Sequence, residues 1–318
     1  MFADKLPQLS LLVQNAERIL VVSHVRPDGD AVGSVLGLGL ALEEAGKQVQ
    51  MVLEDGVPRI YRYLEGSNRV MKRTDGTFDL CCSVDSSDLE RTGDVLDGYG
   101  QPDINIDHHV TNLNYAKINL VDPSAVSTTE ILGELIPAVI GPISPDTAAA
   151  LLTGLITDTI GFRTYNMTSK AMRLAADLMD LGADLPLLYQ RSLVERSYMA
   201  TRFWEAGLRR MERQGGLVWS TLTVEDRNSI GYQGRDDADF INVLSSIEDA
   251  DIALVFIEQP DGSIKVSWRA QPGYDVSQVA LSFGGGGHPA ASGAELCGEI
   301  DEVRNTVLEK TLGILNNN

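Results

Sequence analysis

The sequence predicts an α/β protein in which a parallel-sheet domain is joined by a helical linker to a smaller mixed α/β domain. Short apolar runs of strand length alternate with helical patterns in the first part of the chain, which is typical of βαβ units. The pattern changes after Gly215-Gly216, where the strands no longer alternate regularly with helices. A length of 318 residues fits about two domains. We therefore predict domains at residues 1–184 and 215–318, with the helical linker at 185–214.

The first domain is predicted from strands and helices that follow one another in order. Strands are expected at 19–23, 49–53, 80–84 and 104–106, and helices at 31–45, 128–139, 148–157 and 169–181. Pro27, Asp28 and Gly29 mark the turn after the first strand. Ser127 or Thr128 is a suitable N-cap for the second helix.

The second domain follows an arginine-rich, helix-like segment at 185–211. Strands are expected at 217–224, 252–257 and 263–269, with a helix at 240–247. Asp261-Gly262 stands between the last two strands and is a good hairpin turn. These elements predict a smaller domain of mixed strands and helices.

Composition and charge exclude several classes of function. A net charge of −19 argues against a long duplex nucleic acid as partner, because duplex-binding proteins present a basic surface. No apolar run approaches about 18 residues, and the first residues lack the features of a signal peptide, so we expect no membrane span and a cytoplasmic location. The adjacent Cys81 and Cys82 fit reduced, buried thiols in that compartment.

The four histidines all lie among acidic residues or glycines. His24 opens a segment that contains Asp28 and Asp30, and His108 and His109 follow Asp107 directly. Imidazole and carboxylate together form the ligand set that divalent transition metals prefer. The fourth, His288, closes the run Gly-Gly-Gly-Gly-His, which offers backbone N–H groups and a cationic donor to a phosphate.

Several of these side chains follow predicted strands. His24, Asp85 and Asp107 each stand at the carboxyl end of a strand, where open parallel sheets bind their ligands. Simpler explanations exist for single residues: Asp30 is a suitable N-cap for the helix 31–45, and Asp158 is an ordinary residue for the turn after a helix. The combination predicts a metal site at this edge of the sheet.

Four ordered motifs carry a resemblance to a known family. His-x-x-Pro-Asp-Gly-Asp-Ala-x-Gly-Ser begins at His24, and Val-Asp-Ser-Ser, Asp-His-His and Thr-Asp-Thr follow in this order. Together they resemble the DHH phosphoesterase superfamily, and the segment from Gly284 to Gly293 resembles its DHH-associated C-terminal domain. A compact chain of this kind is most similar to the group of nano-RNases and 3′-phosphoadenosine-5′-phosphate phosphatases.

The resemblance implies two bound Mn²⁺ ions, with Mg²⁺ or Co²⁺ as alternatives, and it implies their ligands. The first ion would be held by His24, Asp28 and Asp85, and the second by Asp30, Asp85, His108 and Asp158. Asp85 would thus bridge the ions, His109 would contact the substrate phosphate or orient a neighbour, and Asp107 would support the adjacent ligands. The implied substrate-binding residues are Arg269, Gly285, Gly286, Gly287 and His288, with Arg163 and Asn166 as weaker candidates.

The expected function is hydrolysis of short RNA or DNA oligonucleotides, from di- to pentanucleotides, with 3′-phosphoadenosine-5′-phosphate as a further substrate. A homodimer is compatible with this assignment. Three alternatives stay open: a phosphodiesterase of cyclic dinucleotides or their linear products, a manganese-dependent inorganic pyrophosphatase, and a non-catalytic nucleotide-binding module. The Gly-Gly-Gly-His segment argues against the pyrophosphatase, and the complete set of implied ligands argues against the module.

Overall fold

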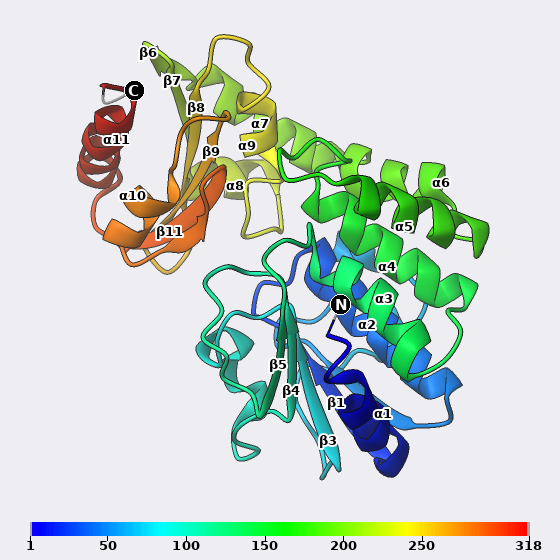
Figure 1. Ribbon diagram of the computed structural model, residues 1–318. Coiled ribbons are helices and arrows are strands. Elements are labelled where there is room, and N and C mark those ends of the chain that lie inside the picture. The colour runs from blue at the N-terminus through cyan, green and yellow to red at the C-terminus, as the bar shows by residue number, and fades with distance from the viewer. Residues whose placement is uncertain (1, 317–318) are drawn as a thin grey trace. The chain divides into compact units, whose positions relative to one another are not determined.

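The computed structural model describes residues 2–316, and the chain divides into two compact units, residues 1–195 and residues 196–318. Each unit is built around a sheet of its own (Figure 1). The sheet of the first unit has five strands in the order β2-β1-β3-β4-β5. The sheet of the second unit has six strands in the order β10-β11-β9-β8-β7-β6. The predicted α/β class with a separate mixed domain is confirmed.

The first unit has an all-parallel sheet. Its strands are β1 (Arg18–Val22), β2 (Gln48–Val52), β3 (Leu80–Val84), β4 (Ile104–Asp107) and β5 (Ile118–Val121). Its α-helices are α1 (Leu6–Asn15), α2 (Gly29–Glu44), α3 (Thr128–Val139), α4 (Pro145–Asp158), α5 (Ser169–Asp180) and α6 (Leu185–Tyr189). Short helical turns add η1 (Arg59–Tyr61), η2 (Ser67–Arg69), η3 (Glu90–Leu96) and the π-turn η4 (Gln190–Val194).

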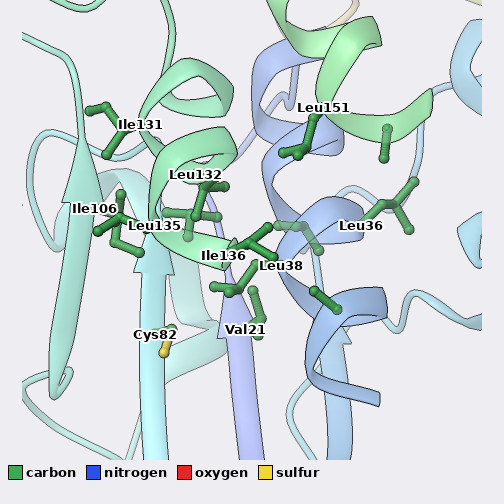
Figure 2. Packing of buried hydrophobic residues seen from close by; sticks show 14 of the residues in the cluster. Val21, Leu36, Leu38, Cys82, Ile106, Ile131, Leu132, Leu135, Ile136 and Leu151 are labelled. Atoms are coloured by element: carbon green, nitrogen blue, oxygen red, sulfur yellow. The ribbon is translucent and has the colours of Figure 1, made fainter. Parts of the chain in front are cut away.

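Both faces of this sheet are buried, which explains why its strands are apolar throughout. On one face, Val21 and Cys82 pack against helical residues such as Leu38 and Ile136 (Figure 2). On the other face, alternate strand residues contact a smaller cluster that includes Val95 and Leu96 of η3. Because Cys82 is buried in the first of these faces, the pKa of its thiol is raised to about 12. The two faces hold the strands rigidly, so their carboxyl ends form a fixed platform.

Glycines let α2 approach α4 closely. A Cβ atom added at Gly33 would lie 2.6 Å from the carbonyl oxygen of Ala150 and 2.9 Å from the amide nitrogen of Gly154. Both of these are backbone atoms, so they cannot rotate away. The close approach also brings the start of α2 beside the end of α4. A Cβ atom added at Gly29 would overlap the side chain of Thr157.

We expect Gly33→Ala to destabilise the first unit. Alanine is a better helix former than glycine by about 1 kcal/mol, but forcing a methyl group against backbone atoms costs about 1–3 kcal/mol. The free energy of unfolding, measured by urea denaturation, should therefore fall. Gly313→Ala in α11 (Ile300–Asn316) is the control, because its Cβ atom would meet no atom within 4 Å, and it should leave stability unchanged or raise it. A Gly33→Ala protein as stable as wild type would contradict this account of the helix contact.

The second unit has a mixed sheet in which β7 and β8 are parallel and the other neighbours are antiparallel. Its strands are β6 (Glu212–Gln214), β7 (Leu217–Leu222), β8 (Ile252–Glu258), β9 (Ser263–Ala270), β10 (Gly286–His288) and β11 (Ala291–Cys297). Its helices are α7 (Tyr198–Arg209), α8 (Val224–Ile230), α9 (Phe240–Leu244), α10 (Ser277–Ser282) and α11. Separate apolar clusters cover its two faces, one around Trp268 and Val307 and the other around Phe203 and Phe240.

Two of the sequence-based expectations need correction. Helix α2 begins at Gly29, and its N-cap is Asp28, whose Oδ1 atom accepts hydrogen bonds from the amides of Asp30 and Ala31. Asp30 is therefore a first-turn residue, not the cap. The segment 185–214, expected as one helical linker, is divided between the units: α6 packs on α4, whereas α7 packs on β7 and α8. Within residues 2–316, none of the helices is long and apolar enough to cross a membrane.

Candidate metal centre and phosphate-binding surface

The metal-type side chains of the first unit gather at the carboxyl edge of its sheet. His24 follows β1, Asp85 follows β3, and the Asp107-His108-His109 sequence begins at the last residue of β4. These three strands are neighbours in the sheet, so their ends lie side by side. Helix α2 starts just after β1 and brings Asp28 and Asp30, whereas α4 ends at Asp158.

Asp85 lies between two histidines. Its Oδ2 atom is 3.6 Å from Nε2 of His24, and its Oδ1 atom is 3.8 Å from Nε2 of His108. Asp28 extends the first pair, with Oδ1 3.9 Å from Nε2 of His24, and Asp158 extends the second, with Oδ2 3.5 Å from Nε2 of His108. Asp30 joins Asp85 and His108 in a third cluster of potential ligand atoms. The six predicted ligands are thus brought together.

These separations fit metal coordination better than direct hydrogen bonding. A hydrogen bond between nitrogen and oxygen spans about 2.7–3.2 Å, whereas these atoms are 3.5–3.9 Å apart. Ligands about 2.0–2.2 Å from one ion lie roughly 3–3.5 Å from each other. A small contraction around a cation would therefore complete the coordination.

The histidine tautomers also suit a metal. Nδ1 of His24 lies 2.8 Å from the carbonyl oxygen of Val25, and Nδ1 of His108 lies 3.4 Å from that of Ala125. A carbonyl oxygen can only accept, so each Nδ1 carries the proton when the ring is neutral, and the Nε2 lone pair faces the carboxylates. Backbone carbonyls commonly orient metal-binding histidines in this way.

Asp85 has a left-handed backbone with φ of 52°. This conformation is uncommon outside glycine, although aspartate and asparagine tolerate it better than other residues. The Asp85 amide donates to the carbonyl oxygen of Ile106 at 2.9 Å, which connects the end of β3 to β4. Such outliers persist where the surrounding structure holds them, and they are concentrated at functional sites.

The start of α3 holds Asp30 in a way that the sequence did not reveal. The Asp30 carboxylate accepts hydrogen bonds from the amide of Thr128 at 2.6 Å and from the amide and hydroxyl of Thr129 at 3.1 and 2.7 Å. The Thr128 hydroxyl donates to Asp85 at 2.9 Å. In the sequence, this threonine pair is indistinguishable from an ordinary helix start. Ser127 caps α3 as predicted, by accepting from the Glu130 amide.

Burial and mutual repulsion set the charge on the central carboxyls. Burial, with the negative charges of Asp85 and Asp158, raises the pKa of Asp30 well above its usual range. Burial would also raise the pKa of Asp85, but the proximity of His24 and the charges of His109 and His108 outweigh it and lower that pKa. Negative charge is therefore concentrated on Asp85, beside the imidazoles of His24 and His108.

The same environment acts on the histidines. Burial alone would lower the pKa of His24 and of His108, yet the neighbouring carboxylates raise both. A cation must displace these protons before the rings can act as ligands. The carboxylates thus favour positive charge on the rings, the same charge that a metal would supply to this cluster.

His109 and Asp107 form a hydrogen-bonded pair at the side of this cluster, where Nδ1 of His109 also lies 3.7 Å from Oδ1 of Asp85. Nδ1 of His109 donates to Oδ1 of Asp107 at 2.7 Å, and the Asp107 carboxylate is fully buried. The same oxygen accepts from the backbone amide of His108 at 2.9 Å. Asp107 therefore supports both histidines: it fixes the Nδ1 side of the His109 ring and the backbone of His108.

In the second unit, Arg269 and His288 occupy one row of the sheet. Ala291 on β11 pairs with Arg269 on β9 at one side and with His288 on β10 at the other. Residues directly opposite each other in a sheet point to the same face. The two long side chains therefore stand on the same face with the small Ala291 between them, an arrangement that suits an anion.

The glycines beside His288 allow the backbone strands to approach closely. A Cβ atom at Gly285 would lie 2.1 Å from the carbonyl oxygen of Gly293, and one at Gly287 would lie 2.5 Å from that of Ala291. Gly287 also has φ of 136°, and Gly286 stands between them in β10. The other predicted substrate residues, Arg163 and Asn166, are exposed in the turn after α4 in the first unit.

Comparisons with known proteins show which family the chain belongs to and which solved structures share its fold. Residues 18–155 match the DHH family, N-terminal domain, and residues 229–312 match the DHHA1 domain. A curated relative from Thermus thermophilus, named bifunctional oligoribonuclease and PAP phosphatase NrnA, is 34% identical over 298 residues, which cover 92% of this chain and 88% of the relative. Here PAP denotes 3′-phosphoadenosine-5′-phosphate.

Solved structures show the same fold. An exopolyphosphatase-related protein from Bacteroides fragilis superposes with a TM-score of 0.88 at 27% identity, covering 98% of this chain and 96% of that one. RecJ from Thermus thermophilus, crystallised with Mn²⁺, gives a TM-score of 0.59 at 16% identity and covers 98% of this chain and 54% of that one. The second similarity concerns the fold alone.

A histidine and carboxylate cluster at the carboxyl edge of a parallel sheet, with a separate second domain, defines a metal-binding hydrolase of phosphoester bonds. The chain belongs to the DHH family and carries the DHHA1 domain.

Proposed function

We propose that this protein is a two-metal phosphodiesterase that hydrolyses short oligonucleotides, from di- to pentanucleotides, to mononucleotides in the cytoplasm, and that it also converts 3′-phosphoadenosine-5′-phosphate to AMP. The observation that carries the proposal is the place of Asp85, whose two carboxylate oxygens face two different imidazoles, His24 and His108. One carboxylate in that position is suited to bridge two cations. The name of the Thermus thermophilus relative supports this substrate class.

The proposed ligands form two sets that share Asp85. The first set is His24, Asp28 and Asp85, and the second is Asp30, Asp85, His108 and Asp158. Mixed imidazole and carboxylate donors favour Mn²⁺, Fe²⁺, Co²⁺ or Zn²⁺ over Ca²⁺ and Mg²⁺. We take Mn²⁺ as the physiological ion, with Co²⁺ and Mg²⁺ as weaker substitutes.

The chain's own residues position the substrate around this centre. When bound, a pair of ions activates water and neutralises the charge on the phosphoryl oxygens. The Asp107 carboxylate accepts a hydrogen bond from Nδ1 of His109. This bond orients the ring so that the Nε2 atom of His109 can donate to a phosphoryl oxygen or to the leaving group. Asp30 is fixed by the first residues of α3, which keeps its carboxylate from rotating away during turnover.

The second unit would bind a phosphate or terminal nucleotide of the substrate. Arg269 and His288 stand on one face of the sheet with Ala291 between them, and the glycines at 285–287 let β10 run close to β11 beside these side chains. Within the first unit, Arg163 and Asn166 are weaker candidates for phosphate contacts. A net charge of −19 limits binding to substrates with few phosphates, because a long strand would be repelled.

A substrate panel with Mn²⁺ tests this proposal. Dinucleotides and short oligomers should be hydrolysed to mononucleotides, and 3′-phosphoadenosine-5′-phosphate should yield AMP and inorganic phosphate. Cyclic dinucleotides, pyrophosphate and long oligomers should be turned over more slowly, and chelation of the metal should stop all activity. The control for contaminating nucleases is an Asp85→Ala variant that is purified in parallel. A preference for pyrophosphate, for cyclic dinucleotides or for long strands would overturn the substrate assignment, and binding without turnover would overturn the enzymatic one.

A further inference from the structure

Asn112 lies in the loop after β4 and contacts the residues behind the metal cluster. Its Nδ2 atom is 2.6 Å from Oδ2 of Asp107, 2.8 Å from Oδ1 of Asn105 and 3.2 Å from the carbonyl oxygen of Ser86. Asn105 and Asp107 both belong to β4, whereas Ser86 directly follows Asp85. One side-chain amide therefore connects the ends of the two strands that carry most of the cluster.

The direction of these hydrogen bonds is determined by backbone groups. Oδ1 of Asn112 accepts from the amide of Asn114 at 2.7 Å, and a backbone amide can only donate. The NH₂ group of Asn112 must therefore face Asp107 and Asn105. Asn105 in turn accepts through Oδ1 and donates through Nδ2 to the carbonyl oxygens of Ser83 and Ser86, which can only accept. Exchanging oxygen and nitrogen in either side chain would break this chain of bonds.

The hydrogen bond from Asn112 determines which partners each oxygen of the Asp107 carboxylate accepts from. With Oδ2 occupied by Asn112, the Oδ1 atom of Asp107 accepts from the His109 ring and from the His108 backbone amide. Asp107 and Asn105 are fully buried, so water does not substitute for these partners at little cost. Without the Asn112 amide, the Asp107 carboxylate could rotate, and both histidines would lose their orientation.

We infer that Asn112 is a positioning residue for the metal centre. Its amide sets the orientation of the Asp107 carboxylate, and through it the ring of His109 and the backbone of His108. It also holds the end of β3, and hence Asp85, against β4. Asn112 contacts neither an ion nor the substrate in this role. The part of the inference that concerns turnover rests on the proposed function, whereas the part that concerns metal affinity does not.

Asn112→Asp is the sharpest test because it is isosteric. It keeps the acceptor for the Asn114 amide but replaces the NH₂ group with an oxygen that faces Oδ2 of Asp107 and Oδ1 of Asn105. Loss of a residue that orients metal ligands typically costs about 10–100-fold in metal affinity or activity. We expect Mn²⁺ binding, measured by calorimetry without substrate, to weaken by at least about tenfold, and kcat to fall with little change in KM.

Asn119→Asp is the matched control. Asn119 belongs to β5, and its side chain bonds backbone groups of Ala116 and Asn114, so the same change in charge is made away from the cluster. It should bind Mn²⁺ and turn over substrate nearly as wild type does. Asn112→Ala removes the NH₂ group without adding charge and keeps the test valid if Asn112→Asp does not fold; it should weaken Mn²⁺ binding in the same direction but less.

A reciprocal exchange separates positioning from general damage to the loop. In the double variant Asp107→Asn with Asn112→Asp, residue 107 can donate to residue 112 and still accept from His109, so Mn²⁺ binding should recover in part relative to Asn112→Asp alone. Folded Asn112→Asp and Asn112→Ala proteins that bind Mn²⁺ as tightly as the Asn119→Asp control would overturn the inference. A wild-type protein that binds no Mn²⁺ would instead contradict the proposed function.

Discussion

Asp85→Ala is expected to abolish phosphoester hydrolysis while the chain stays folded. Asp85 faces both His24 and His108, so its loss removes a ligand from both proposed ion sites at once. Residues that act as one unit have non-additive effects, and losing this one should cost as much as removing the whole metal centre. Activity should therefore fall to that of the wild-type protein after chelation, and bound Mn²⁺ should fall with it.

The left-handed backbone of Asp85 requires a second variant. Alanine at a φ of 52° adds strain of roughly 1–2 kcal/mol, whereas glycine adopts this conformation freely. Asp85→Gly should thus be as inactive as Asp85→Ala but more stable to denaturant. Asp97→Ala, at an exposed position after η3, is the control and should retain activity and metal. Near-normal turnover by a folded Asp85→Ala protein would rule out the two-metal assignment.

His288→Ala is expected to reduce kcat/KM by about 10- to 150-fold, which corresponds to the roughly 1.5–3 kcal/mol of a hydrogen bond to a charged group. The proposed metal ligands all belong to the first unit, so the content of Mn²⁺ should stay unchanged. His288→Gln keeps a neutral donor and should lose less.

The measurement combines steady-state kinetics on a dinucleotide with metal analysis of the same preparation. Lys265→Ala, in β9 four residues before Arg269, removes a cation from the same sheet and should change kcat/KM little. A loss of bound Mn²⁺ in His288→Ala would show that His288 has been given the wrong role, and unchanged kinetics would remove it from the substrate site.

The architecture and the ligand cluster could be predicted because they depend on local patterns. Buried parallel strands are continuous apolar runs, and the candidate ligands His24 and Asp85 stand where two of those runs end. The bridging position of Asp85 was available only through the family resemblance. Its geometry depends on the spacing of strands that are far apart in the sequence.

Other features depend on contacts that no local pattern contains. Strand β10 is only three residues long and rich in glycine, so it has no apolar alternation to detect. The segment 185–211 is helix-like along its whole length, and only the packing of α6 and α7 onto different units shows where it divides. Thr128 and Asn112 act on the cluster through side-chain bonds to residues that are distant or buried, which explains why they were missed.

The glycines of α2 also determine when the site can form during synthesis. A helix that contains Gly29, Gly33, Gly37 and Gly39 is weak in isolation, because each glycine costs about 1 kcal/mol relative to alanine. It is stabilised by tertiary packing, most extensively against α4, which leaves the ribosome much later than β1, β3 and β4. A nascent chain that ends before α4 therefore contains all the proposed ligands except Asp158, but it lacks the helix against which α2 packs most closely.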